Sequence, residues 1–300
     1  MTQSGVRAMK TAVLGLGLLG SEIALRLKRQ GREVVGWNRG SERAEAARKR
    51  GVMLAGSPEE AIAEADIACL LLSDAEAILD TLFRGADADR LAGCIVVQMG
   101  TIAPRESRDI AEHVAAQGGE YLEAPVLGSL PEAREGNLIL MAGGDPDLFE
   151  RCLPVLKDLS RDPRLIGDLG QGAALKLAMN QLIAGLTATF SLSLGLVRRE
   201  NIDVEQFMTL LRSSALYAKT FDKKLDKYLS HDYGAANFPL KHLHKDVRLF
   251  RRVADENALD TRLTAAIESA CLQAEEQGLG DLDYSALYES FCDPSSNRET

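Results

Sequence analysis

Short apolar runs alternate with amphipathic stretches along the first half of the chain. The apolar runs, expected to form strands, span residues 10–14, 33–37, 67–72, 94–99, 121–123 and 138–141. Stretches with helical spacing lie between them, at 21–30, 43–50, 74–83 and 104–117, and a further helix start is expected at Ser57. This alternation is typical of a parallel sheet that is covered by helices. It predicts roughly six or seven strands before residue 168.

The pattern changes after Gly172, because only helical spacing remains at 173–199, 204–212, 241–255, 261–277 and 284–291. The first of these helices would span roughly 40 Å. We therefore expect an α/β fold, with a Rossmann-type, doubly wound sheet domain over residues 1–168. A long interdomain helix joins it to an all-α C-terminal domain over 169–300, which serves substrate binding and oligomerisation. Residues 293–300 are expected to be disordered.

The composition narrows the class of protein. A chain of 300 residues with 46% hydrophobic and 26% charged positions is typical of globular domains. Its net charge of −9 argues against a general nucleic-acid binder and against a protein of anionic membrane surfaces. No stretch reaches the ~18 uninterrupted apolar residues of a membrane span. The 5 cysteines include no Cys-x-x-Cys pair, which argues against a disulfide framework and favours the cytoplasm.

A glycine-rich segment separates the first expected strand from the first expected helix. It consists of Gly15, Leu16, Gly17, Leu18, Leu19 and Gly20. In a strand–loop–helix context, such a segment makes a tight turn and lets backbone N–H groups approach a pyrophosphate. The helix N-terminus then faces the phosphates with its positive dipole end. The alternative, that these glycines serve only a turn, is disfavoured by this context.

The end of the second expected strand bears on the choice of cofactor. A carboxylate at this place would bind the ribose hydroxyls of NAD, but the chain has Arg39, with Asn38, Ser41 and Arg43 around it. A guanidinium pairs with a phosphate, whereas a carboxylate would repel it. We therefore expect NADP as the cofactor. The alternative is that Arg39 is an ordinary solvated loop arginine.

A second candidate site lies at the predicted domain boundary. Lys176 and Asn180 are four residues apart in the long helix, so they share one face, and glycines precede them. A lysine beside a carbonyl group stabilises and protonates the alkoxide that forms when hydride arrives. Periodicity alone would favour a surface lysine on an amphipathic helix.

Four motifs together resemble one enzyme family. They are the glycine loop, the segment 123–129, the glycine-rich turn before Lys176 and the pair Lys245–Asp246. The chain thus resembles the β-hydroxyacid dehydrogenases, which include 3-hydroxyisobutyrate dehydrogenase, tartronate semialdehyde reductase and, more distantly, 6-phosphogluconate dehydrogenase. Segments 238–249 and 278–285 most resemble the glyoxylate/succinic semialdehyde reductases. The resemblance extends over residues 10–287.

The resemblance implies roles for individual residues. Lys176 would be the catalytic lysine and Asn180 its polar companion. The cofactor-binding residues would be Gly15, Leu16, Gly17, Leu18, Leu19, Gly20, Asn38, Arg39, Ser41, Arg43, Leu72, Thr101 and Lys245. The substrate-binding residues would be Val126, Leu127, Gly128, Ser129, Thr101, Phe238 and Asp246.

Two positions depart from the family pattern. Leu127 stands where the family usually has a serine, and Gly100 stands where it has a serine before Thr101. A buried hydroxyl bonded to a charged group contributes roughly 1.5–3 kcal/mol, so its loss weakens the binding of small carboxylates. Either the backbone amides near Gly128 suffice, or the substrate is larger or less polar, an aldehyde or an imine.

These observations favour an NADPH-dependent reductase of short aldehyde acids. Alternatives are an imine reductase-like enzyme, another family member with an untypical substrate, and a non-catalytic NADP-bound scaffold. His242 and His244 point in different directions on a helix, so no metal is expected. By resemblance, we expect a homodimer or homotetramer with a small-molecule substrate and without nucleic-acid or membrane partners.

Overall fold

The structure, a computed structural model, describes residues 9–84 and 89–292, so the expected disorder of residues 293–300 lies outside the described residues. The chain divides into two compact units, Met1–Lys176 and Leu177–Thr300, which we call the sheet unit and the helical unit. The division falls inside helix α8 (Gln171–Arg199), eight residues after the expected boundary at 168. The first turn of α8 counts with the sheet unit because its N–H groups are bonded to Glu123 of that unit.

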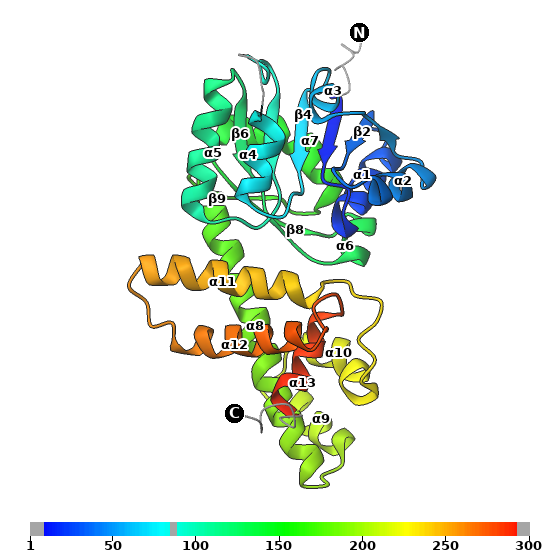
Figure 1. Cartoon of the computed structure of the whole chain (residues 1–300), viewed down its shortest axis with the longest axis vertical. Helices are drawn as coiled ribbons and strands as arrows, with labels where there is room; N and C mark the ends of the chain where they lie inside the picture. Colours follow the sequence, from blue (N-terminus) through cyan, green and yellow to red (C-terminus); the bar gives the residue numbers. More distant parts are fainter. Residues whose placement is uncertain (1–8, 85–88, 293–300) are drawn as a thin grey trace. The chain divides into compact units, whose positions relative to one another are not determined.

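The sheet unit holds one sheet of 9 strands in the described part of the chain (Figure 1). The strands are β1 (Thr11–Leu14), β2 (Val34–Trp37), β3 (Met53–Leu54), β4 (Ile67–Leu70), β5 (Ile95–Gln98), β6 (Glu120–Glu123), β7 (Val126–Leu127), β8 (Ile139–Gly143) and β9 (Arg164–Gly167). Their order is β3-β2-β1-β4-β5-β6-β8-β7, and β9 pairs with β8. β3 to β6 are parallel, whereas β8 runs antiparallel to β6 and β7. The chain direction across the sheet reverses between β1 and β4, which is where nucleotide-binding folds of this kind hold their ligand.

Helices cover both faces of this sheet. They are α1 (Leu18–Arg29), α2 (Ser41–Lys49), α3 (Pro58–Ile62), α4 (Ala75–Phe83), α5 (Pro104–Ala116), α6 (Leu130–Glu135) and α7 (Pro146–Leu159). Successive residues of β4 alternate between two hydrophobic cores: Ile67 and Cys69 join one, and Ala68 and Leu70 join the other. The first core includes residues of α1, α6 and α7, and the second includes residues of α3, α4 and α5. A strand that is buried on both faces reads as a continuous apolar run.

The sequence predicted β1, β2, β4, β5, β6 and β8, but it missed β3, β7 and the four-residue strand β9. β3 and β7 have two residues each, too few to show a period of two. The helix expected at 43–50 is confirmed as α2, and Ser57 caps α3 by accepting a hydrogen bond from the N–H of Glu60 at 3.2 Å. The fold class expected from the alternation of elements, a Rossmann-type sheet domain followed by a helical domain, is confirmed.

The helical unit contains the remainder of α8 and several further elements. These are α9 (Val204–Ser213), α10 (Lys219–Ser230), α11 (Leu240–Glu256), α12 (Arg262–Glu276), the 3₁₀ turn η1 (Tyr284–Ala286) and α13 (Leu287–Cys292). Its main core joins Leu243 and Val247 of α11 to Ile267 and Cys271 of α12. The sequence analysis did not predict α10.

α10 escaped the sequence pattern because a lysine occupies one of its core positions. The ammonium of Lys224 lies 2.8 and 2.7 Å from the two carboxylate oxygens of Asp283, and both side chains are buried. Burial lowers the pKa of Lys224, while the carboxylate of Asp283 opposes that shift. The buried charge of Lys224 is compensated by the carboxylate of Asp283. The lysine interrupts the apolar stripe by which the helix would have been recognised in the sequence.

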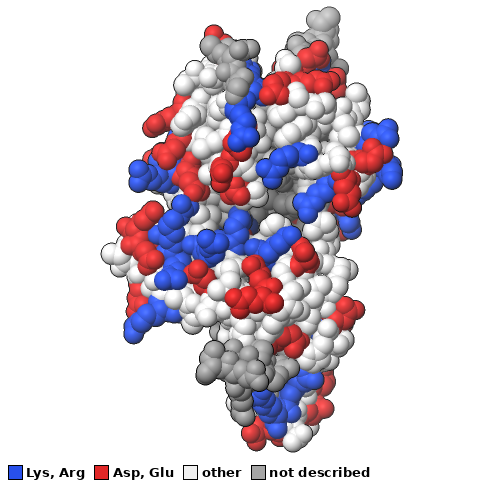
Figure 2. All heavy atoms as spheres, viewed as in Figure 1, with Lys and Arg blue, Asp and Glu red and all other residues white. Residues whose placement is uncertain are grey.

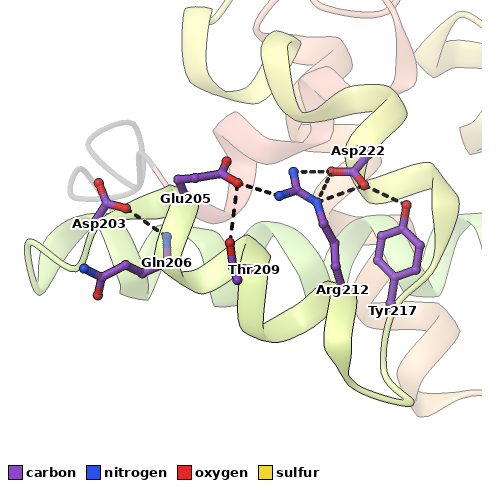
Figure 3. A network of polar contacts seen from close by, with 7 residues as sticks. All are labelled: Asp203, Glu205, Gln206, Thr209, Arg212, Tyr217 and Asp222. Atoms are coloured by element: carbon purple, nitrogen blue, oxygen red, sulfur yellow. Dashed lines mark hydrogen bonds and ion pairs between the residues drawn. The ribbon is translucent and has the colours of Figure 1, made fainter.

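A surface network ties α9 to α10 (Figure 3). Arg212 donates to Glu205 at 2.6 Å and to Asp222 at 2.8 Å, and the hydroxyl of Tyr217 donates to Asp222 at 2.7 Å. The guanidinium of Arg212 lowers the pKa of Asp222. Because Asp222 belongs to α10 and Arg212 to α9, the network fixes the loop between these helices.

One described helix, α8, is long and apolar enough to cross a membrane when judged by length and composition alone. Its 18-residue window has a mean hydropathy of 1.3, and 50% of that window is buried inside the protein. The core helix of a soluble protein passes the same test, so this property is weak evidence for a membrane span.

Candidate active site

The glycine loop has the geometry that its spacing predicts. Gly15 has a φ of +101°, and a Cβ at this position would overlap the carbonyl group of Leu71 at the end of β4. A Cβ on Gly20 would overlap the carbonyl oxygen of Gly15. Both positions therefore require glycine, one for the turn and one for close packing of α1.

Gly17 differs, because the space in front of it is open. The nearest atom to a Cβ built there is Nη1 of Arg43, at 3.7 Å. Gly17 is the N-cap of α1 and has no side chain to cap it, so the first N–H groups of the helix have no intrahelical acceptor. The loop thus leaves room and donors for a phosphate group, and the pyrophosphate of a dinucleotide fits it.

Asn38 holds this loop against the end of β2. Its Oδ1 accepts from the N–H of Leu16 at 2.9 Å, and its Nδ2 donates to the carbonyl of Gly40 at 2.9 Å. Both polar ends of this amide are used within the protein, so the structure gives Asn38 a bracing role. Arg39, Ser41 and Arg43 lie exposed just beyond β2, and the guanidinium of Arg43 adjoins the loop at Gly17.

The segments after β4 and β5 meet at Leu72 and Gly100. A Cβ on Gly100 would lie 2.8 Å from the carbonyl oxygen of Leu72, closer than real Cβ atoms approach. The N–H of Gly100 donates to Oε1 of Gln98 at 2.9 Å. A serine, the family's residue here, would require this backbone to shift. The departure from the family pattern at Gly100 therefore has a steric cause in this chain, and it brings Leu72 close to the segment that carries Thr101.

The expected carboxylate-binding turn is partly engaged within the protein. Gly128 has a φ of +139°, and a Cβ there would lie 2.8 Å from Leu138. The N–H and the hydroxyl of Ser129 both donate to Oε2 of Glu132, at 2.8 and 2.6 Å. A substrate carboxylate would have to compete with Glu132 for these donors. Leu127 is half-buried beside them and adds an apolar side chain.

Lys176 lies near the start of α8 and is 8% exposed. It precedes Asn180 by one helical turn, so both side chains leave the same face of the helix. The turn before α8 contains Gly167 and Gly170, both with positive φ, and Gly172, whose Cβ would lie 2.5 Å from the carbonyl oxygen of Met141. This glycine-rich turn therefore lets the helix begin directly against strand β8.

The helical unit brings three of the expected residues together. Nδ2 of Asn180 donates to Oδ2 of Asp246 at 2.6 Å, and the ammonium of Lys245 lies 2.9 Å from Oδ1 of Asp246. Asn180 and Asp246 are buried. The carbonyl oxygen Oδ1 of Asn180 has no hydrogen-bond partner among the described residues. Phe238 precedes α11 by two residues. Its ring is stacked on that of His242, with 6.5 Å between the ring centroids.

α11 also carries a row of cations. Lys241, Lys245, Arg248 and Arg252 are spaced by four, three and four residues, so they share one helix face. Figure 2 shows Lys and Arg side chains gathered over α11. Lys241 and Lys245 are ion-paired with Asp281 and Asp246, and Arg248 and Arg252 are exposed on this face of an acidic chain.

The histidines of α11 have other partners. Nδ1 of His244 lies 3.1 Å from Oε1 of Glu275, and this imidazole is buried. Among residues 9–84 and 89–292, no group of three or more His, Cys, Asp or Glu side chains is arranged to hold a metal ion.

Sequence reasoning missed one residue of the site. Glu123 ends β6 and its carboxylate bonds the first turn of α8. Its partners are far from it in sequence, so no local pattern could have revealed them. The signals in the sequence were a glutamate at the end of β6, directly after Tyr121 and Leu122, and its place as the first residue of the motif 123–129.

Two family models match the chain in succession. The NAD binding domain of 6-phosphogluconate dehydrogenase matches residues 10–169, and the NAD-binding domain of NADP-dependent 3-hydroxyisobutyrate dehydrogenase matches residues 170–291. Together they cover nearly all described residues, in the order that the resemblance predicted.

Similar proteins include enzymes and one nuclear factor. The chain is 32% identical to glyoxylate/succinic semialdehyde reductase 1 of Arabidopsis thaliana, over 94% of this chain and 98% of the relative. It is 30% identical to the cytokine-like nuclear factor N-PAC of Anopheles gambiae, over 93% of this chain and 50% of the relative. The solved 3-hydroxyisobutyrate dehydrogenase of Salmonella typhimurium has a TM-score of 0.80 at 22% identity, over 94% of this chain and 99% of that one, which speaks for the fold.

The geometry of the glycine loop and both family matches indicate a dehydrogenase with a nicotinamide cofactor. The chain belongs to the β-hydroxyacid dehydrogenase family, and it is an oxidoreductase that acts on hydroxyl or carbonyl groups of small molecules with a nicotinamide cofactor.

Proposed function

We propose that the enzyme is an NADPH-dependent reductase of short aldehyde acids, of the glyoxylate or succinic semialdehyde type. The observation that carries this proposal is the pair on α8, a buried Lys176 one turn before an Asn180 that is bonded to Asp246. The name of the Arabidopsis relative supports the substrate class.

The bound reduced nicotinamide supplies a hydride to the carbonyl carbon of the substrate. Lys176 holds the proton that the carbonyl oxygen takes up as it becomes an alkoxide. Oδ1 of Asn180 is a buried acceptor without a partner among the described residues. Leaving such an acceptor unsatisfied costs roughly 1–3 kcal/mol. The hydroxyl of the product is a donor that satisfies it. Lys245 is ion-paired with Asp246, the same carboxylate that accepts from Nδ2 of Asn180.

NADP is the cofactor that Arg39 and Arg43 favour. Both residues are exposed just after β2, and the guanidinium of Arg43 adjoins Gly17 of the glycine loop. There they would pair with the phosphate that distinguishes NADP from NAD. Replacing Arg39 by aspartate should weaken NADPH binding far more than NADH binding, because the new carboxylate repels the phosphate. Titration of both cofactors followed by fluorescence measures this, and equal losses for the two would count against NADP.

An apolar stripe on α8 supports the expected homodimer or homotetramer. Leu182, Leu192 and Leu196 are 59%, 55% and 63% exposed, and Gly185 has no atom within 4 Å of a built Cβ. Their spacing places them on one face, which a second copy of this helix would cover. The 5 free cysteines agree with a cytoplasmic location, where thiols remain reduced.

Leu127 favours a second candidate, reduction of a less polar carbonyl or imine. The direct experiment is an NADPH-oxidation screen of the purified protein over aldehyde acids, apolar aldehydes and cyclic imines. We expect turnover with the aldehyde acids. Turnover confined to cyclic imines would favour the second candidate, and tight NADPH binding without turnover of any compound would favour a scaffold.

A further inference from the structure

A buried carboxylate lies where β6 ends and α8 begins. Glu123 is 1% exposed, and its Oε1 accepts hydrogen bonds from three backbone N–H groups. These belong to Gly170 at 2.8 Å, Gly172 at 2.8 Å and Ala173 at 3.2 Å. One side-chain oxygen thus holds both the turn before α8 and the first turn of the helix itself.

The second carboxylate oxygen is bonded to α5. Oε2 of Glu123 accepts from the hydroxyl of Ser107 at 2.5 Å, and that hydroxyl lies 3.0 Å from the hydroxyl of Tyr121. Ser107 lies in the first turns of α5, which begins at Pro104 shortly after Thr101. The carboxylate therefore connects α8 to the helix that follows the Thr101 segment.

The surrounding chain is shaped to admit this carboxylate. A Cβ on Gly143 of β8 would overlap Oε1 of Glu123, and a Cβ on Gly172 would lie 3.1 Å from it. Arg108, which follows Ser107 on α5, donates from Nε to the carbonyl of Leu169 at 3.2 Å. Two consecutive residues of α5 thus help to hold the turn that leads into α8.

We propose that Glu123 is a positioning residue, which fixes the start of α8 and through it the reactive Lys176 on the sheet unit. The inference rests on the proposed role of Lys176. Lys176 follows Ala173 by three residues, less than one helical turn, so its Cα is set by the same anchored turn. A helix that is held at its first N–H groups neither slides nor rotates freely. A displacement of about 1 Å at a reacting group costs on the order of 100-fold in rate.

The charge of Glu123 agrees with positioning rather than with simple packing. A negative charge at a helix N-terminus is favourable, and four donors converge on this carboxylate. Burial nevertheless raises the pKa of Glu123 above its ordinary value, against those donors. An apolar side chain of similar volume would leave these four donors without an acceptor, so the site requires an acceptor although its ionisation is opposed by burial.

The test compares two variants that remove different parts of the anchor. Glu123→Gln keeps an oxygen acceptor for the backbone N–H groups, and its amide can donate to Ser107, whereas Glu123→Ala removes both contacts. With saturating NADPH and an aldehyde acid, we expect kcat to fall roughly 10-fold in the first variant and on the order of 100-fold in the second. NADPH affinity should stay within about 2-fold, because the glycine loop is untouched. Hydrogen exchange at the amides of 170–173 should accelerate in the same order.

The control is Asp158→Asn, which weakens the half-buried ion pair with Arg32 (2.7 Å) in the same unit. It should lower the melting temperature and leave kcat unchanged. The positioning role is overturned if the Glu123 variants lose no more kcat than Asp158→Asn does for the same drop in melting temperature. It is also overturned if Glu123→Ala keeps kcat while Lys176→Ala loses it. A Lys176→Ala variant with full kcat would instead contradict the proposed function, and the exchange rates would still report whether Glu123 anchors α8.

Discussion

Two buried carboxylates of the sheet unit, Glu22 and Glu123, are held in opposite ways. The side chain of Glu22 is 4% exposed, and its Oε1 lies 2.9 Å from Arg50 and 3.0 Å from Arg134. Burial opposes the ionisation of Glu22, but the hydrogen bonds from Arg134 and Arg50 outweigh it and lower the pKa of Glu22. Glu123 meets only neutral donors, and burial raises its pKa.

The difference separates a stabilising ion pair from a group kept for its position. A lowered pKa means that the folded state favours the ionised form, so Glu22 stabilises the fold at neutral pH. A raised pKa means the reverse, so the ionised Glu123 costs stability at neutral pH. Substitutions at the two sites should therefore separate stability from activity.

The largest expected effect on stability comes from Gly143→Ala. The new methyl group would overlap Oε1 of Glu123 and lie 3.0 Å from the carbonyl oxygen of Asp168. Such overpacking costs roughly 1–3 kcal/mol, and it also pushes Glu123 away from α8. We expect a lower melting temperature together with a lower kcat, measured by thermal unfolding and steady-state kinetics. An unchanged kcat in a destabilised Gly143→Ala protein would show that displacing Glu123 does not reach Lys176.

Glu22→Gln should lower the stability of the fold less than Gly143→Ala does, because the arginine partners of Glu22 are about half-exposed and remain solvated. We expect a loss of about 1 kcal/mol at pH 7 and an unchanged kcat. The contribution of Glu22 is fully present above its unfolded pKa and disappears as pH falls through its lowered folded pKa. Urea unfolding between pH 7 and pH 3 measures this. A difference between variant and wild type that does not shrink with acid would contradict the assignment.

The smallest expected change in stability is that of Glu123→Gln. Since the folded pKa is raised, the destabilising contribution of the carboxylate is fully present above that pKa and is relieved as pH falls toward the unfolded value. The neutral amide avoids this cost, so the melting temperature at pH 7 should not fall below that of the wild type. A clear drop in melting temperature without a loss of kcat would make Glu123 a stabilising residue like Glu22.

The sequence predicted the parts of the site whose residues are near one another in the chain. In the six-residue loop from Gly15 to Gly20, the glycine spacing and the flanking strand and helix patterns lie next to one another in the sequence. The structure shows that a Cβ on Gly15 or Gly20 would overlap neighbouring backbone atoms. Lys176 and Asn180 are one turn apart, so their shared face also follows from the sequence. Their expected roles, like those of the other site residues, remain predictions.

What the sequence could not predict depends on distant partners. The donors to Glu123 lie at Ser107 and at 170–173, and Asp246 meets Asn180 from a helix 66 residues further along. The amide of Asn38 is bonded to Leu16, 22 residues away in the chain, and its expected role at the cofactor remains a prediction. The reason for Gly100 also became clear only from the approach of Leu72. Such facts arise when separate segments meet, and no local period encodes them.

The most direct test of the central claim is the kcat of Lys176→Ala with NADPH and an aldehyde acid, compared with the wild type. The account predicts that kcat falls by several orders of magnitude while NADPH affinity is nearly kept, because the proton source is lost and the glycine loop is intact. A Lys176→Ala enzyme that reduces the same aldehyde acid at the wild-type rate would contradict it.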